Sequence, residues 1–265
     1  MKKIIYYIGL LFLFLIPTLG WTYGAPALNA SAAILVDAAT GKVIYGKNSL
    51  AIMAPASTTK IMTAILTLEK LRLDQTVVVR PEAAAREGTS MDLQSREKRT
   101  VRELLYGLML ESGNDAATAL AEAVSGTEEN FARLMNQKAR LLGMKNTVFK
   151  NASGLPVVGH YTTAYDMALL TRYALKNANF AIIVSTKAKQ IPGARPGATR
   201  SLANHNKLLW RYPYAIGVKT GYTVTAGGCL VAAASYGGKT LISVVLKTGT
   251  IYDDAIKLFR YGFSR

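Results

Sequence analysis

The chain has 265 residues, which is enough for a sizeable buried core organised as one or two domains. Its 32 Lys and Arg residues against 16 Asp and Glu give a formal net charge of +16, which favours anionic surroundings such as cell-wall polymers or anionic lipid. The one cysteine, Cys229, excludes an intrachain disulfide and a cysteine-based metal site, and its place in an apolar run predicts a buried structural thiol.

The N-terminus carries the pattern of a secretory signal peptide. Lys2 and Lys3 precede an apolar run at residues 4–16, and the small-residue site Ala25-Pro26-Ala27 follows. This pattern predicts a signal peptide over residues 1–27. An uncleaved membrane anchor is the alternative, because the apolar run is nearly long enough to span a bilayer. In both cases we expect the rest of the chain at the outer face of the cytoplasmic membrane, in the cell wall or in the periplasm, where nucleic acid is a poor partner.

Both ends of the remaining chain predict β-structure. A turn-rich segment, residues 37–41, separates two apolar runs at 33–36 and 42–45, which predicts a hairpin. Toward the C-terminus the pattern predicts three strands and a closing helix, at residues 217–222, 229–235, 240–246 and 252–259. Strands at both ends around a helical middle imply that the hairpin and the C-terminal strands share one antiparallel sheet. The predicted fold class is α/β (α+β), an antiparallel β-sheet flanked by helices.

The middle of the chain, about residues 78–185, predicts a helical subdomain inserted into a single domain that spans residues 28–265. Capping-box patterns at residues 100–103 and 163–166 start helices there. The helices are expected at residues 104–110, 115–124, 128–142 and 164–175. Ahead of this subdomain, residues 57–71 predict a helix whose apolar side chains cover most of its surface, which indicates a buried helix.

Polar residues in the first turn of that buried helix predict a nucleophile and its base. Ser57 and Lys60 lie three residues apart, so on a helix they share a face. An amine held in an apolar setting has a lowered pKa, so Lys60 can take the proton from Ser57. Alone, this spacing is more often an N-cap serine and a surface lysine. A fully buried helix, however, offers no surface face for Lys60.

A second polar triplet, Ser112-Gly113-Asn114, falls between two predicted helices, where a loop can direct side chains into a cleft. The hydroxyl of Ser112 can relay a proton to a leaving amine, and the amide of Asn114 can hold a substrate carbonyl. The alternative is a pair of helix caps, in which Gly113 ends one helix and Asn114 starts the next. Taken alone, the triplet favours that alternative.

A third triplet, Lys219-Thr220-Gly221, begins a predicted strand. Lysine and threonine side chains bind carboxylates, and glycine lets a ligand approach the backbone closely. The N–H of the next residue, Tyr222, can complete an oxyanion hole with that of Ser57. A second copy of the triplet, residues 247–249, is rejected because it ends a strand and leads directly into the closing helix.

Missing residue types narrow the chemistry further. The chain has two histidines, His160 and His205, both in loop-like segments, which disfavours a Ser-His-Asp triad and a histidine metal cluster. We expect both to be loop hydrogen-bonders, and we expect no metal and no cofactor. No glutamate follows Glu129, whereas a class A β-lactamase needs one in a later loop for rapid deacylation. The one acid between Glu129 and Lys219 is Asp166, which its capping-box position explains.

With the three motifs placed, residues 31–263 resemble the low-molecular-mass penicillin-binding proteins, the serine-type D-Ala-D-Ala carboxypeptidases. The likeness extends to the context of each motif, at residues 54–63, 104–116 and 204–223. The resemblance implies that Ser57 is the acylated nucleophile and that Lys60 is its base. It further implies a set of residues that relay protons, bind substrate and complete the oxyanion hole, namely Ser112, Asn114, Lys219, Thr220, Gly221 and Tyr222. The fold it implies is a sheet flanked by helices plus a helical subdomain.

The activity that the resemblance implies is that of a serine D,D-carboxypeptidase, which removes the terminal D-alanine from peptidoglycan stem peptides through an acyl-enzyme. β-Lactam antibiotics are then expected as covalent inhibitors. A D,D-endopeptidase acting on cross-links is the closest alternative, because the motifs do not fix the leaving group. The missing glutamate disfavours a β-lactamase, and the intact Ser57–Lys60 pair disfavours a non-catalytic wall-binding module.

Two features depart from the family pattern. The chain stops at Arg265, so we expect neither the C-terminal β-rich domain nor the amphipathic anchor of many members. Attachment to a membrane or wall polymer then depends on the N-terminal segment or on charge alone. Residues 94–99 are also unusually charged where the family tends to have a glycine turn, and we expect an altered approach to Ser112 there.

Overall fold

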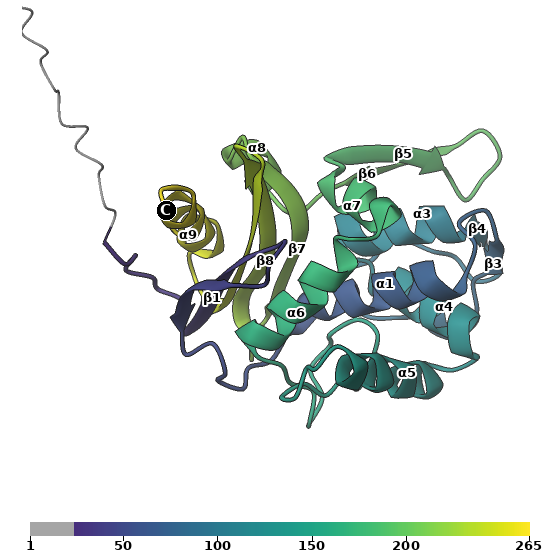
Figure 1. Ribbon diagram of the computed structural model, residues 1–265. Coiled ribbons are helices and arrows are strands. Elements are labelled where there is room, and N and C mark those ends of the chain that lie inside the picture. The colour runs from purple at the N-terminus through teal and green to yellow at the C-terminus, as the bar shows by residue number, and fades with distance from the viewer. Residues whose placement is uncertain (1–23) are drawn as a thin grey trace, which may run out of the picture.

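The computed structural model describes residues 24–265, and its centre is a five-stranded antiparallel sheet in the order β2-β1-β9-β8-β7 (Figure 1). The strands are β1 Ala32–Asp37, β2 Val43–Lys47, β7 Ala215–Thr223, β8 Gly227–Tyr236 and β9 Lys239–Thr248. Strand β1 pairs with both β2 and β9, so the N-terminal hairpin and the C-terminal strands share one sheet, as predicted. Strand β7 lies at one edge of this sheet.

Both faces of the sheet are covered. Helix α9, Ile251–Phe263, packs on one face, where Leu230 of β8 and Leu258 of α9 belong to one buried cluster (Figure 1). The next residue of β8, Val231, points the other way and belongs to the core shared with the remaining helices. The middle of β8, residues 229–234, is therefore apolar on both faces. Cys229 is buried in it, and burial raises the pKa of its thiol to about 11, which agrees with the predicted structural role.

A group of helices packs on the other face of the sheet and extends beyond it (Figure 1). Its α-helices are α1 Lys60–Lys70, α2 Pro81–Ala84, α3 Val101–Tyr106, α4 Asn114–Ser125, α5 Glu128–Leu141, α6 Ala164–Ala174 and α7 Ala178–Ser185. A π-helical turn, η2 Gly107–Glu111, continues α3. Each predicted helix is present, and the first eight residues of α1 are all buried, as its apolar surface required.

The two predicted capping boxes differ. At α3 the box is complete, because the Thr100 hydroxyl accepts from the Glu103 N–H and the Glu103 carboxylate accepts from the Thr100 N–H. At α6 the Thr163 hydroxyl accepts from the Asp166 N–H, which is only half of a box. The Asp166 carboxylate instead accepts from the Thr147 hydroxyl at 2.7 Å and from the backbone N–H of Asn146. Asp166 therefore ties the segment after α5 to α6 rather than closing a capping box.

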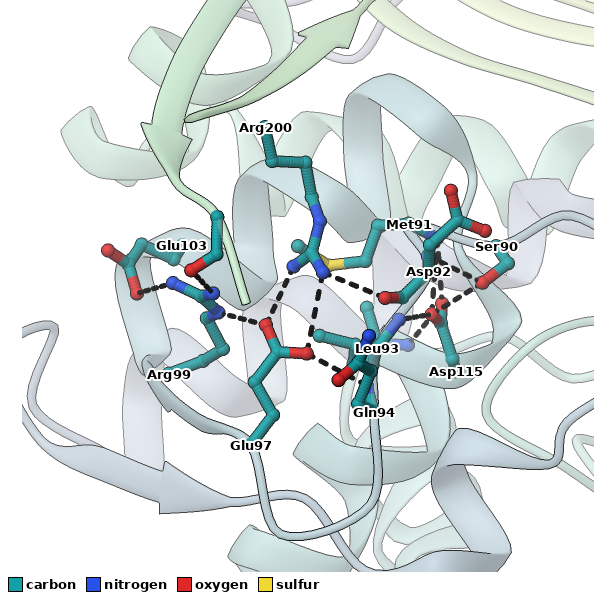
Figure 2. Close-up of polar contacts among 12 residues, drawn as sticks. Ser90, Met91, Asp92, Leu93, Gln94, Glu97, Arg99, Glu103, Asp115 and Arg200 are labelled. Carbon is teal, nitrogen blue, oxygen red and sulfur yellow. Dashed lines mark hydrogen bonds and ion pairs between the residues drawn. The ribbon is translucent and has the colours of Figure 1, made fainter. Parts of the chain in front are cut away.

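Two small sheets and one short helix escape prediction, because each of their elements has five residues or fewer, too few to show a hydrophobic period. They are β3 Thr76–Val78 with β4 Lys98–Thr100, β5 Ala188–Pro192 with β6 Thr199–Ala203, and α8 Leu208–Arg211. Figure 2 shows ion pairs that join the two small sheets. The Glu97 carboxylate accepts hydrogen bonds from Arg99 of β4 and, at 2.9 Å, from Arg200 of β6. The charged segment 94–99 thus ties structural elements together.

The predicted signal peptide, residues 1–27, lies outside the described residues apart from positions 24–27. None of the helices within residues 24–265 combines the length and the hydropathy that a membrane crossing requires.

Candidate active site

Ser57 lies in a 3₁₀ turn rather than in the α-helix that the sequence predicts. This turn, η1 Ala56–Thr59, directly precedes α1, whose first residue is Lys60. Ala56 has a φ angle of +47°, a left-handed conformation that costs energy in a residue with a side chain. Such strain concentrates at functional sites, where the surrounding structure holds it. Ser57 itself is half-buried and lines a cleft at the sheet's edge.

Lys60 is fully buried behind Ser57. Its Nζ lies 3.0 Å from Ser57 Oγ, 2.7 Å from the side-chain oxygen of Asn114 and 2.7 Å from the backbone oxygen of Ser153. Burial holds the pKa of this amine well below its usual value, and the nearby Lys219 charge lowers it further. A lysine with a depressed pKa beside a hydroxyl is equipped to accept that hydroxyl's proton.

Lys219 is a second buried lysine and is 1% exposed. Burial lowers the pKa of its amine to about 7, and Nζ donates to the backbone oxygen of Thr220 at 3.0 Å. Two buried amines near each other disfavour simultaneous protonation. The pair can therefore divide its roles at neutral pH, one amine acting as a base and the other carrying charge.

The Asn114 amide does not cap a helix, so the capping alternative does not account for it. Asn114 is the first residue of α4, yet its side-chain oxygen accepts from Lys60 Nζ and its nitrogen donates to the backbone oxygen of Glu87 at 2.7 Å. Ser112 adopts a left-handed conformation with φ of +62° where the π-helical turn η2 ends, and it is 5% exposed. Both residues line the same cleft as Ser57.

The triplet Lys219-Thr220-Gly221 lies inside β7, not at its start as predicted. Residues 219 and 221 share one face of the strand because side chains alternate. That face meets the η1 turn so closely that a Cβ on Gly221 would stand 2.9 Å from the Ser57 nitrogen. Glycine at 221 is therefore required for the edge strand to lie against the turn of Ser57.

A cleft of about 550 Å³ brings the predicted residues together. Six of them line it: Ser57, Ser112, Asn114, Thr220, Gly221 and Tyr222. Lys60 and Lys219 lie buried behind this lining. The repeated triplet at residues 247–249 ends β9 as expected, and its Thr248 and Gly249 also line the cleft. Residues 94–99 do not contribute to the lining.

The predictions from sequence missed one residue that supports the site: Asp115, directly after Ser112-Gly113-Asn114. It is fully buried and accepts from the Ser90 hydroxyl at 2.6 Å and from the N–H groups of Met91 and Leu93 (Figure 2). The segment it holds continues from Gly88 and Thr89, which line the cleft. The available signal was an acid in the first turn of a helix whose next residues, 116–121, are almost all apolar, since such a residue needs buried partners.

Neither histidine forms a triad with Ser57. His160 Nε2 lies 3.2 Å from the Thr59 hydroxyl, and burial lowers the pKa of this imidazole to about 4. His205 lines the cleft and lies 3.2 Å from a carboxylate oxygen of Glu111. Within residues 24–265, no group of three or more His, Cys, Asp or Glu residues is placed to hold a metal ion.

Comparison with known proteins gives one consistent result. The family model described as D-alanyl-D-alanine carboxypeptidase matches residues 21–250. D-alanyl-D-alanine carboxypeptidase DacF of Bacillus subtilis is 40% identical over 249 residues, which cover 90% of this chain but 63% of that protein. The D-alanyl-D-alanine carboxypeptidase of Streptomyces sp. strain K15 is 37% identical over 258 residues, covering 90% of this chain and 89% of that one. The chain thus spans less than two thirds of the Bacillus relative's length.

Solved structures agree. The Streptomyces K15 DD-transpeptidase has a TM-score of 0.87 at 36% identity, covering 92% of this chain and all of that one. The D-alanyl-D-alanine carboxypeptidase of Mycobacterium tuberculosis H37Rv has a TM-score of 0.88 at 33% identity, covering 92% and 95%. These likenesses confirm the predicted fold class of an antiparallel sheet flanked by helices. The chain belongs to the D-alanyl-D-alanine carboxypeptidase family.

Proposed function

We propose that this chain is a serine D,D-carboxypeptidase that removes the terminal D-alanine from peptidoglycan stem peptides through an acyl-enzyme on Ser57. One observation carries the proposal: the fully buried amine of Lys60, with its lowered pKa, lies 3.0 Å from the Ser57 hydroxyl. Chemistry of this kind needs no metal and no cofactor, because the lysine activates the hydroxyl directly.

In the acylation step, Ser57 Oγ attacks the carbonyl carbon of the penultimate D-alanine while its proton passes to neutral Lys60. The N–H groups of Ser57 and Tyr222 stabilise the oxyanion that forms. When the C–N bond breaks, the leaving D-alanine takes up a proton, relayed from Lys60 through the Ser112 hydroxyl. Water then attacks the ester and returns its proton by way of Lys60, which frees Ser57 and the shortened peptide.

Substrate binding uses the free edge of β7. The terminal carboxylate binds to Lys219 and Thr220, and the side-chain nitrogen of Asn114 orients the peptide carbonyl. Lys219 binds a carboxylate when its amine is protonated. With a pKa of about 7, that amine is partly protonated in the free protein at neutral pH. A carboxylate that arrives stabilises the charged form further.

β-Lactams are proposed to acylate Ser57, and the resulting acyl-enzyme is hydrolysed slowly. Their ring-opened leaving group stays attached to the acyl group, and no Asp or Glu of the described chain lines the cleft to activate water strongly. This favours a penicillin-binding enzyme over a β-lactamase.

We also propose that the chain acts outside the cytoplasm, with residues 1–27 as a signal peptide and residues 28–265 as the catalytic domain, the helical subdomain included. The formal net charge of +16, or +14 without Lys2 and Lys3 of the signal peptide, supports peripheral association with anionic membrane or wall polymers.

Incubation with defined muropeptides, followed by mass analysis, tests the activity. A pentapeptide stem that loses one alanine, while cross-linked dimers stay intact, is the expected result. Cleavage of the cross-link with the pentapeptide left whole would replace the proposal by D,D-endopeptidase action.

A further inference from the structure

Glu128 begins α5 and joins two segments that are far apart in the sequence. Its Oε2 accepts from Nη2 of Arg86 at 2.7 Å, and its Oε1 accepts from the backbone N–H of Ala152 at 2.9 Å. The Glu128 side chain is 16% exposed. Within residues 24–265, Glu128 is the one hydrogen-bond partner of the Arg86 guanidinium, whose Nε is buried without a partner. The two oxygens of one carboxylate therefore hold two different segments.

One of these segments leads to Asn114. Glu87 follows Arg86 in the chain, and its backbone oxygen accepts from the side-chain nitrogen of Asn114 at 2.7 Å. The side-chain oxygen of Asn114 in turn accepts from Lys60 Nζ at 2.7 Å. The ion pair between Arg86 and Glu128 therefore holds the backbone that fixes the Asn114 amide.

The other segment leads to Lys60 directly. Ser153 follows Ala152, and its backbone oxygen accepts from Lys60 Nζ at 2.7 Å. The backbone oxygen of Ala152 accepts from the Thr63 hydroxyl at 2.6 Å, about one turn of α1 beyond Lys60. With its N–H held by Glu128 and its oxygen held by Thr63, Ala152 fixes the position of the next carbonyl group.

The two oxygens that accept from Lys60 decide where the lone pair of its amine points. A neutral amine has two N–H groups and one lone pair. When the N–H groups donate to Asn114 and Ser153, the lone pair faces the remaining neighbour, Ser57 Oγ, at 3.0 Å. Transfer of a proton from the serine requires this alignment before any suitable pKa can act.

We propose that Glu128 is a positioning residue for acyl transfer, because its carboxylate holds both acceptors of the Lys60 amine and so keeps the lone pair on Ser57. This inference rests on the proposed function. Glu128 acts through other residues, since it does not line the active-site cleft. Lys60 serves both acylation and deacylation, so both steps depend on the hold.

Steady-state release of D-alanine from a defined pentapeptide stem by the purified full chain tests this role. Glu128→Leu removes both holds. We expect kcat to fall at least about tenfold and KM to stay within about twofold, because the proposed carboxylate ligands Lys219 and Thr220 lie on β7. A kcat within about twofold of the wild-type value would overturn the proposal. A raised KM with kcat unchanged would also overturn it, because Glu128 would then act on substrate binding.

Two milder variants keep the test decisive if Glu128→Leu does not fold. Glu128→Gln retains one acceptor oxygen, and Arg86→Leu leaves Glu128 bound to Ala152, so each should lower kcat about threefold. Wild-type kcat in both would overturn the proposal. Where the variants fold, the double change Arg86→Leu with Glu128→Leu should cost no more kcat than Glu128→Leu alone, because both act through one carboxylate. Losses that multiply would contradict this shared route.

Two other acids provide matched controls. Glu129 lies in the same first turn of α5 and is exposed, so Glu129→Leu measures the loss of a negative charge at the helix N-terminus. Glu69 is 23% exposed and pairs with Lys138 of α5 at 2.8 Å, so Glu69→Leu measures the loss of a half-buried ion pair. We expect Glu69→Leu and Glu128→Leu to lower the melting temperature similarly, and both controls to keep wild-type kcat. A loss of kcat in Glu69→Leu equal to that in Glu128→Leu would overturn the proposal, because lowered stability alone would then explain it.

Failure of the positioning role is distinct from failure of the proposed function. If the role alone is wrong, the wild-type protein releases D-alanine and Glu128→Leu matches its kcat. If the proposed function is wrong, the wild-type protein releases no D-alanine and penicillin leaves Ser57 unmodified, which overturns both.

Discussion

The backbone of Gly154 lies directly against the carbonyl group of Ala56, so closely that a side chain at 154 would overlap it. Ala56 precedes the nucleophile, and Ser153, next to Gly154, offers its backbone oxygen to Lys60 at 2.7 Å. A loop about a hundred positions along the chain thus contacts both the turn that carries Ser57 and the lysine behind it.

This packing predicts that Gly154→Ala disrupts the site. We expect a loss of stability of about 2–4 kcal/mol, from overlap with the Ala56 carbonyl and from a φ of +88° that disfavours any side chain. Acylation by a fluorescent penicillin should slow by at least about tenfold, because Ser57 and Lys60 no longer hold their geometry. Gly143→Ala is the matched control. Its φ is +76°, but a Cβ there meets nothing within 4 Å, so it should cost about 1 kcal/mol and leave acylation unchanged.

Asp115 should be required for the segment that borders the cleft. Asp115→Asn removes the negative charge and replaces one carboxylate oxygen by an NH2 group, so Ser90 Oγ and the N–H groups of Met91 and Leu93 are left with one neutral acceptor oxygen. We expect the free energy of unfolding to fall by about 2–3 kcal/mol. The exposed Asp92 gives a control, since Asp92→Asn should change the denaturation midpoint little. An unchanged midpoint for Asp115→Asn would contradict the anchoring role.

The stability of the protein should fall in acid because of His160. Its folded-state pKa of about 4 lies below the ordinary 6.5, so the unfolded state binds the proton more readily. This contribution is present in full above pH 6.5 and is lost as the pH falls toward 4, by about 3 kcal/mol in total. Chemical denaturation of wild type and His160→Gln across this range provides the measurement. An equally steep decline in the variant would show that other groups are responsible.

Alkaline pH should weaken substrate binding through Lys219. With a pKa of about 7 in the free protein, the amine must regain a proton whenever a carboxylate binds at higher pH. KM for acetyl-Lys-D-Ala-D-Ala should therefore rise about tenfold per pH unit above pH 8, while kcat does not fall in parallel. Lys219→Arg stays charged over this range and should flatten the KM profile. A wild-type KM independent of pH between 7 and 9 would exclude this role.

Much of the fold follows from patterns within single segments. The alternation and turns at both ends predict the shared sheet, and the apolar surface of residues 60–67 predicts a buried α1. The capping pattern at Thr100 and Glu103 gives a complete box. Such features are local, so the sequence contains them in full.

What escapes prediction depends on tertiary contacts. The 3₁₀ turn at Ser57 depends on packing against Gly154 and Gly221, which lie far away in sequence. Asp166 completes no capping box, and its carboxylate instead accepts from the Thr147 hydroxyl in the segment after α5. Thr248 reaches the cleft only because β9 lies next but one to β7 in the sheet. Each of these outcomes needs the assembled fold.

The most direct measurement of the central claim is the mass of the protein after brief incubation with benzylpenicillin, followed by peptide mapping. One adduct per chain, located on the peptide that contains Ser57 and missing from Ser57→Ala, is the predicted result. Full labelling of Ser57→Ala, or an adduct on any other residue of the wild-type chain, would show that the hydroxyl beside Lys60 is not the nucleophile.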